Sequence, residues 1–451
     1  MGLDRREKIF VAIVTAAGFG LRLYFLAAYE NIFSWEAEDY SKINLVLTWM
    51  QNGMPYPDPN FGPLHTWLIY LLTRPFEDMV LPVRIFSLVT GAATLPVFYL
   101  VARRLGAGAA ATATMLFAFF PVHVRAGATS LAEAPYTLAF FGGLALFFAH
   151  DAKRQASFAY LAGSAACLTA AAMLRFEAWL FYPLLCLLAL RRGVVRAVGY
   201  GALLAVFPAW HMFYCWKTTG NPLAFGQTSA SSFLLYLPQM PLSYRASAWL
   251  VAFWHALSPP LFVLCWLGLV WAAFARKGGM LVALFLFPYA FLSYRTLRGM
   301  IDPALLRCSV VLAGLLIPLA GGALWNAMRV LLRRERAAQI GTGVVTAAMA
   351  VFMTTWAVAQ AEENRLPKDV KELARFLREE TRPDDRIILD KRFHPYLVVE
   401  SRHDPDAFAS LLYEGGADHR QGEIRAPRAQ VFPAGLPAGA GGHVGPRHQT
   451  L

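Results

Sequence analysis

Long apolar runs dominate the pattern of hydrophobic and polar positions along the chain. Each run is close to the roughly 20 residues that a helix needs to cross a bilayer, and most runs lack the polar face that a soluble helix turns to water. The pattern therefore predicts an all-α polytopic membrane protein with about eleven transmembrane helices. The expected spans are residues 9–28, 82–102, 108–124, 134–149, 158–174, 177–190, 196–215, 249–274, 280–294, 308–328 and 340–359.

Short basic breaks between the runs indicate the orientation of the spans. Lys and Arg are enriched in cytoplasmic loops of membrane proteins. With the N-terminus in the cytoplasm, eleven spans place all strong basic pairs on that side. These pairs are Arg103 with Arg104, Lys153 with Arg154, Arg191 with Arg192, Arg276 with Lys277, and Arg333 with Arg334. The apolar piece at 64–72 is too short to span, so we expect it to lie at the membrane interface.

Composition agrees with this class and excludes others. Of 451 residues, 57% are hydrophobic and 16% are charged, and the mean hydropathy is +0.44. The net charge of +12 is explained by the basic clusters at the ends of spans, so no nucleic-acid partner is expected. The five cysteines form no CxxC pair, which argues against a disulfide framework or a zinc site.

The composition changes after the last span. We expect residues 1–360 to form the membrane domain, with a long first outer loop at 29–81. Residues 361–415 are predicted to form a small extracytoplasmic α/β region with a helix at 367–380 and strands at 386–390 and 396–400. The tail at 416–451 is rich in Gly, Pro, Arg and His without periodicity and is predicted to be disordered.

Three carboxylates follow the first span within four residues: Glu36, Glu38 and Asp39. At this spacing they can raise one another's pKa or hold a divalent cation between their oxygens. One of them could then take the proton from an acceptor hydroxyl. The alternative is a solvated loop whose acids only follow the charge asymmetry across the membrane.

Two other outer segments carry candidate chemistry. Glu133 lies between two apolar runs, and His123 and Arg125 before it could donate to an anion; the alternative is a plain loop with a Glu near a helix N-terminus. Arg175 and Glu177 form a tight outer turn. Arg175 could hold a phosphate there, or the two residues could be a purely structural pair.

Three arginines are predicted on the outer face, against the positive-inside rule: Arg295, Arg298 and Arg307. Cations where the topology disfavours them suggest an anionic ligand, and a lipid phosphate fits. The alternative is ordinary contact of arginines with lipid headgroups.

Taken together, these segments resemble the GT-C superfamily of polyprenyl-phosphate-sugar-dependent glycosyltransferases, and within it proteins similar to the protein O-mannosyltransferases and the aminoarabinose transferase of lipid A. The resemblance covers about residues 10–330. It rests on the acidic motif after the first span, Gly62-Pro63-Leu64 with His65, the segment 83–91 with Arg84, Pro121-Val122-His123 followed by Glu133, and Leu174-Arg175-Phe176-Glu177.

The resemblance implies transfer of a sugar from a polyprenyl-phosphate donor to a glycan, lipid or protein acceptor, generally with inversion at the anomeric carbon. It implies an enzyme of a bacterial or archaeal cell membrane whose active site faces the outside or the periplasm. The family commonly presents an Asp-Glu pair in the first outer loop; here Trp35 precedes Glu36, so the Asp position is lost. Which acid is the base therefore stays open, as does a divalent metal such as Mg²⁺ or Mn²⁺; no other cofactor is expected.

The expected catalytic residues are Glu36, Glu38, Asp39 and Glu133, with Glu133 assisting the acceptor or a metal. The expected substrate-binding residues are His65, Arg84, His123, Arg125, Arg175, Glu177, Arg295, Arg298 and Arg307. Two alternatives remain: a transporter or lipid-linked sugar flippase without chemistry, and a non-catalytic scaffold on the same fold. A transporter would show ionisable residues within the spans and paired halves with broken helices, whereas the charges here collect at one face.

Overall fold

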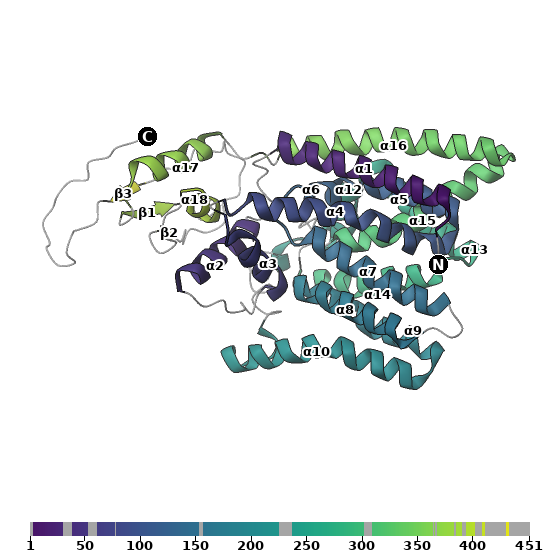
Figure 1. Ribbon diagram of the computed structural model, residues 1–451, viewed down its shortest axis with the longest axis horizontal. Helices are drawn as coiled ribbons and strands as arrows, with labels where there is room; N and C mark the ends of the chain where they lie inside the picture. The colour runs from purple at the N-terminus through teal and green to yellow at the C-terminus, as the bar shows by residue number, and fades with distance from the viewer. Residues whose placement is uncertain are drawn as a thin grey trace, which may run out of the picture.

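The computed structural model is a bundle of long helices with a smaller group of short elements at one end (Figure 1). It describes residues 3–29, 38–52, 61–76, 78–152, 157–224, 237–301, 309–363, 365, 368–382, 385–389, 394–401, 408–410 and 430–432. Six helices in this part of the chain are long and apolar enough to cross a membrane: α1 (Arg5–Ala28), α4 (Leu81–Ala102, continued by η1, Arg103–Leu105), α10 (Val194–Thr219), α14 (Gly279–Leu297), α15 (Val310–Leu332) and α16 (Glu335–Glu363). The membrane-protein prediction is confirmed, whereas the count of eleven spans and their orientation stay predictions.

Shorter helices fill the rest of the bundle: α5 (Ala107–Ala118), α6 (Pro121–Ala126), α7 (Glu133–Ala152), α8 (Phe158–Leu174), η2 (Phe176–Phe181), α9 (Tyr182–Ala189) and η3 (Leu190–Arg192). The expected span at 108–124 is divided, because α5 ends at Ala118 and α6 starts with Pro121, which cannot continue the preceding helix. The expected span at 177–190 likewise consists of a 3₁₀ segment and a short helix.

The predicted single span at 249–274 is wrong in its geometry. It consists of α12 (Leu242–Leu257) and α13 (Pro259–Ala275), which meet at an angle of 118°. Ser258 between them has φ 71°, and the following Pro259 disfavours helical backbone at the residue before it. The chain therefore turns sharply where the apolar pattern alone reads as continuous.

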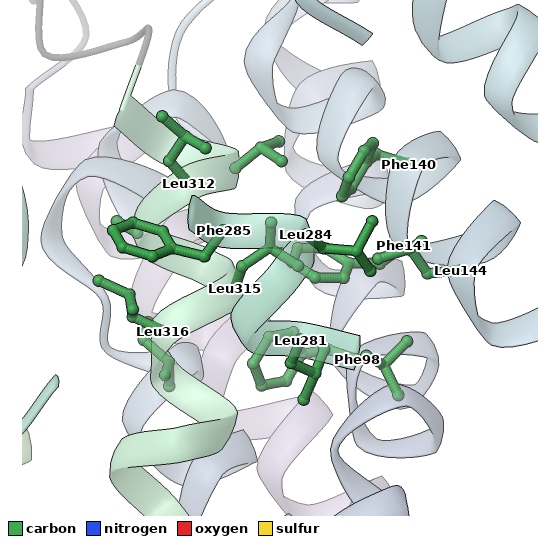
Figure 2. Close-up of a cluster of buried hydrophobic side chains, with 14 of the residues drawn as sticks. Phe98, Phe140, Phe141, Leu144, Leu281, Leu284, Phe285, Leu312, Leu315 and Leu316 are labelled. Carbon is green, nitrogen blue, oxygen red and sulfur yellow. The ribbon is translucent and has the colours of Figure 1, made fainter. Parts of the chain in front are cut away.

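The core of the bundle surrounds α15. Aromatic and leucine side chains from α4, α7, α14 and α15 meet there (Figure 2). Phe98 of α4 stacks on Phe117 of α5 with ring centroids 4.0 Å apart. A Cβ at Gly268 of α13 would lie 2.5 Å from the backbone of α15 at Ala320. Small residues thus let the helix backbones approach closely, as is common between membrane helices.

A second core lies at the end of the bundle opposite the N-terminus (Figure 1). It joins α2 (Glu38–Asn52) and α3 (Pro63–Thr73) of the first outer loop to α17 (Lys368–Glu380) and α18 (His394–Ser401). Tyr40 of α2 packs edge-on against Tyr396 of α18, with centroids 5.1 Å apart. The expected interfacial helix at 64–72 is α3, whose 11 residues are too few to span. Helix α2 was not expected.

The C-terminal region holds a three-stranded sheet in the order β2-β1-β3. Strand β1 (Arg386–Leu389) pairs in parallel with β2 (Phe408–Ser410) and antiparallel with β3 (Gln430–Phe432). The predicted helix at 367–380 and strand at 386–390 are confirmed, but the predicted strand at 396–400 is wrong, because these residues lie in α18. Strand β3 lies within the tail that was predicted to be disordered. The boundaries of the predicted regions 361–415 and 416–451 stay predictions.

Ion pairs join the helices at the end of the bundle near the N-terminus. Glu7 accepts from Arg103 at 2.7 Å and from the Tyr99 hydroxyl at 2.9 Å, which ties α1 to α4. Asp151 at the end of α7 pairs with Arg104 at 2.5 Å and with Arg192 at 3.5 Å. The basic residues that predict the orientation of the spans therefore also connect the helices, through Glu7 and Asp151.

Candidate functional site

A chain of ion pairs connects the start of α7 to the turn after α8. One Nη of Arg175 lies 2.5 Å from Oε1 of Glu133, and the other lies 2.7 Å from Oε1 of Glu177. Glu133 is the first residue of α7 and is 1% exposed. Arg175 ends α8 in an extended conformation, which turns its side chain toward both acids. Glu133 and the Arg175 turn were predicted as separate segments, and the fold joins them.

Helix α3 packs against this turn and adds His65. A Cβ at Gly62 would lie 2.4 Å from the Met173 carbonyl oxygen, so a glycine is needed where the first outer loop crosses the end of α8. His65 is 1% exposed, and neither ring nitrogen has a hydrogen-bond partner in the described part of the chain. Burial, and then the charges of Lys42 and Arg175, hold the pKa of His65 well below its ordinary value. A neutral imidazole therefore lies beside the ion pairs.

Lys42 of α2 completes the group and was missed from the sequence. It is 3% exposed, and its Nζ lies 5.3 Å from the ring centroid of Phe61. Burial raises the pKa of Glu177, but the attraction of Arg175, the hydrogen bond between them and the charge of Lys42 outweigh it and leave that pKa below its ordinary value. The sequence signal for Lys42 was a cation in a loop predicted to face outside, against the positive-inside rule, as for the outer arginines. We call Lys42, His65, Glu133, Arg175 and Glu177 the charged cluster.

Two residues of the acidic motif lie at the start of α2, the helix that also carries Lys42. Glu36 lies outside the described residues, and Glu38 and Asp39 open α2, although their side chains are not described. Lys42 follows Glu38 by four residues on this helix. One helix therefore holds both Lys42 and the backbone of Glu38 and Asp39.

Arg84 of α4 occupies the seam between α2 and α4. It is 4% exposed, and its Nη2 lies 3.4 Å from the hydroxyl of Tyr40. This contact joins the bundle to the outer group of helices. Its predicted role in substrate binding stays a prediction.

His123 and Arg125 of α6 are both buried and both contact other helices. Nδ1 of His123 lies 2.6 Å from Arg22 of α1, and Arg125 donates to Gln360 of α16 at 3.2 Å. Arg22 was missed by the sequence analysis, although a lone arginine in an apolar run was a signal for it. The structure brings neither His123 nor Arg125 into a hydrogen bond or ion pair with a described residue of the charged cluster.

The predicted outer arginines are not brought into direct contact with the charged cluster in the described chain. Arg295 lies in the last turn of α14 and Arg298 caps its end, with Arg298 exposed and Arg295 half-buried. Helix α14 packs against η2, which carries Glu177. Arg307 lies outside the described residues.

Two further features of the described chain concern metal ligands and cavities. In the described ranges, no three His, Cys, Asp or Glu side chains come together as a metal site would require. A cavity of about 640 Å³ opens between α1 and α4, lined mostly by apolar groups such as Val11, Ala12 and Pro96. It contains none of the predicted site residues.

Comparison with known proteins identifies the fold. Residues 58–216 match the dolichyl-phosphate-mannose-protein mannosyltransferase family, and this range includes Glu133 and Arg175. The structure resembles ArnT from Cupriavidus metallidurans bound to undecaprenyl phosphate, with a TM-score of 0.61 and 15% identity over 90% of this chain and 86% of that one. The chain has the GT-C fold. The predicted resemblance to this superfamily is thereby confirmed.

An archaeal oligosaccharyltransferase shares the GT-C fold. The chain is similar to AglB from Archaeoglobus fulgidus in complex with an inhibitory peptide and a dolichol-phosphate, with a TM-score of 0.55 and 13% identity over 84% of this chain. It spans 59% of the length of that protein. No curated protein matches the sequence significantly.

Proposed function

We propose that the protein is an integral membrane glycosyltransferase that moves a sugar from a polyprenyl-phosphate donor to an acceptor hydroxyl on the outer face of a bacterial or archaeal cell membrane. The observation that supports this most directly is the ion-paired chain of Glu133, Arg175 and Glu177 beside Lys42 and His65. The part of the sequence that matches a mannosyltransferase family, residues 58–216, includes all residues of the charged cluster except Lys42. Solved structures of the same fold hold undecaprenyl phosphate and dolichol-phosphate.

The proposed reaction is a single displacement at the anomeric carbon. A first-loop carboxylate, Glu36, Glu38 or Asp39, takes the proton from the acceptor hydroxyl. The acceptor oxygen then forms a bond to the anomeric carbon while the bond from that carbon to the phosphate oxygen breaks, with inversion. The electron pair stays on the phosphate, which leaves as polyprenyl phosphate. Because the phosphate is already ionised in the donor, the leaving group needs no general acid.

Charge on the departing phosphate is balanced by the nearby cations. Lys42 and Arg175 supply them from the charged cluster, and Arg295, Arg298 and Arg307 are predicted from the sequence to lie on the same face. Both Nη groups of Arg175 already donate to carboxylates. We therefore assign to Glu133 and Glu177 the role of aiming Arg175, and to Lys42 the more direct contact with the phosphate.

His65 has a separate role as a neutral hydrogen-bonding group. Its lowered pKa keeps it uncharged near the cations Lys42 and Arg175. A neutral imidazole can donate one hydrogen bond and accept another, which suits a sugar or acceptor hydroxyl. The acceptor class, whether glycan, lipid or protein, is not distinguished by these contacts.

A divalent metal at this site would need several oxygen ligands. Oε2 of Glu133 is buried without a hydrogen-bond partner in the described chain, which is one oxygen ligand. The other described acid of the charged cluster, Glu177, is held by Arg175. A metal site would need the first-loop acids, so no step here is assigned to a metal.

The test is release of polyprenyl phosphate by the purified protein in lipid nanodiscs, with a panel of polyprenyl-phosphate sugars and candidate acceptors. We expect turnover with at least one donor. Glu36→Gln, Glu38→Gln and Asp39→Asn identify the base, and replacement of the base should lower kcat at least about 100-fold. Lys42→Met should raise the donor KM. Glu335→Gln, at the start of α16 and outside the charged cluster, is the matched control and should leave kcat unchanged.

Two outcomes would contradict the proposal. Movement of a labelled donor across the membrane without turnover would indicate a transporter or flippase. That alternative draws some support from the break at Ser258 and from the buried Arg22. However, the break is held by Trp356 and Gln360, which donate to the His255 carbonyl at 3.1 and 2.8 Å, as expected of a fixed structural element. Unchanged function after replacement of all three first-loop acids would indicate a scaffold.

A further inference from the structure

Arg22 is a charged side chain buried inside a membrane-spanning helix. It lies on α1, six residues before the end of that helix, and is 0% exposed. Its guanidinium forms no ion pair with a carboxylate in the described ranges. Instead, Nη1 donates to the carbonyl oxygens of Gly18 at 2.8 Å and Ala118 at 3.3 Å, and Nη2 lies 2.6 Å from Nδ1 of His123.

Two glycines leave the space that the Arg22 side chain occupies. A Cβ at Gly127 would lie 2.8 Å from Cδ of Arg22, and a Cβ at Gly91 would lie 3.1 Å from Nε. Gly127 caps α6, and Gly91 lies in α4. The Arg22 side chain therefore passes between α4 and the end of α6, where a larger residue at either glycine would collide with it.

The contact with Arg22 determines the protonation state of His123. A guanidinium only donates hydrogen bonds, so Nδ1 of His123 must be the acceptor. The proton of the neutral imidazole then lies on Nε2. His123 is also packed on Phe117, with ring centroids 4.6 Å apart, so its ring is held from two sides.

The hydrogen-bond partners of Arg22 outside α1 in the described chain, Ala118 and His123, lie at or within one short segment, and Gly127 lies in the same segment. Ala118 is the last residue of α5, His123 lies in α6, and Gly127 follows it. From Gly127, the chain runs through a buried loop to Glu133, which begins α7 and binds Arg175. This loop has no helix of its own, so its path depends on how α6 is held.

We propose that Arg22 is a positioning residue that locks α6 and the segment 119–132, and so holds the Glu133 carboxylate in register with Arg175. The role in catalysis rests on the proposed glycosyltransferase activity, whereas the locking itself does not. An apolar side chain could fill the same space at lower cost in a membrane. It could not satisfy the Ala118 carbonyl, which lies at the end of α5 without a helical partner, or fix the His123 ring.

Three measurements test this role. In ¹⁵N-histidine spectra, the wild type should show His123 as the Nε2-protonated tautomer with a hydrogen-bonded Nδ1, assigned by His123→Gln. Arg22→Met should remove that signature and raise the rate of amide hydrogen exchange in 119–132 while leaving exchange in α15 unchanged.

In the transferase assay, Arg22→Met should lower kcat about 100-fold, the scale of a misplaced catalytic group, with the donor KM nearly unchanged. Arg22→Lys, which keeps a donor, should recover part of kcat.

Controls separate positioning from folding and from the proposed function. Arg6→Met removes an exposed arginine from the same helix and should match the wild type in all three measurements. Gly127→Ala keeps Arg22 but should displace it, so we expect the same exchange pattern as for Arg22→Met. If Arg22→Met does not fold, the same measurements on Gly127→Ala and Arg22→Lys decide between the outcomes.

The outcomes are distinct. An unchanged tautomer and unchanged exchange in Arg22→Met would overturn the locking. Altered exchange with unchanged kcat in an active enzyme would overturn the positioning role. If the wild type catalyses no transfer, the proposed function fails, while the tautomer and exchange results still decide whether Arg22 locks the segment.

Discussion

Glu133 and Arg175 are 42 residues apart in the sequence, yet an oxygen and a nitrogen of their side chains lie 2.5 Å apart. Both side chains are largely buried, with 1% and 10% exposure. The pair joins the start of α7 to the end of α8 and aims Arg175 between two acids.

Removing either partner of this pair should destabilise the protein strongly. Glu133→Gln or Arg175→Gln leaves a buried charge with fewer partners, and we expect a loss of about 3–5 kcal/mol in the free energy of unfolding. The double variant should lose less than the sum of the two. Unfolding in detergent, followed by tryptophan fluorescence, measures these energies. Arg365→Gln, which breaks the exposed pair with Glu362, should cost about 0–1 kcal/mol. Additive effects would show that the buried pair is not coupled.

Stability should fall as the pH is lowered through the range in which an ordinary histidine becomes protonated. The pKa of His65 is well below 6.5 in the folded protein, so below that pH the unfolded chain binds a proton that the folded state resists. The free energy of unfolding then decreases by up to about 1.4 kcal/mol per pH unit. Thermal unfolding of the wild type between pH 8 and about 5 should show this dependence. It should be weaker in His65→Gln and unchanged in His255→Gln, whose ring is exposed. Equal pH dependence in the wild type and His65→Gln would contradict the prediction.

Gly62 should not tolerate a side chain. A Cβ there would lie 2.4 and 2.6 Å from two carbonyl oxygens at the end of α8, so Gly62→Ala must push α3 and His65 away from Arg175. We expect a cost of about 1–3 kcal/mol and a large loss of activity. The comparison is Gly20→Ala in α1, where a Cβ would meet nothing within 4 Å. That change should be neutral or stabilise by about 0.5–1 kcal/mol. Similar melting temperatures for the two variants would argue against close packing at Gly62.

Gln360 should be needed to hold α6 and α12 against α16. It accepts from Arg125 at 3.2 Å and donates to the His255 carbonyl at 2.8 Å. Gln360→Ala removes both bonds, and we expect a loss of about 1–3 kcal/mol, because buried polar groups lose their partner. Hydrogen exchange should increase in α6 and at the end of α12. Gln339→Ala, an exposed glutamine on the same helix, should have no effect. Unaltered exchange in α6 would show that Arg125 does not depend on this contact.

Several elements could be predicted because local physics decides them. The apolar runs predicted the membrane helices, and their length excluded α3 as a span. The Arg175-Glu177 pair was expected because the two residues are close in sequence. The bend at Ser258 was not expected, because a hydropathy average does not register a single residue with positive φ. Helix α2 was missed because the loop around it reads as irregular.

The sequence by itself determined the class of the protein, its resemblance to GT-C transferases and most of the ionisable residues of interest, since desolvation cost depends on residue type. Only the tertiary structure decided which charges meet. Glu133 with Arg175, Lys42 beside Glu177, and Arg22 with His123 are long-range or cross-element contacts set by how helices pack. Helix packing depends on the shapes of several surfaces at once, which a one-dimensional pattern does not contain.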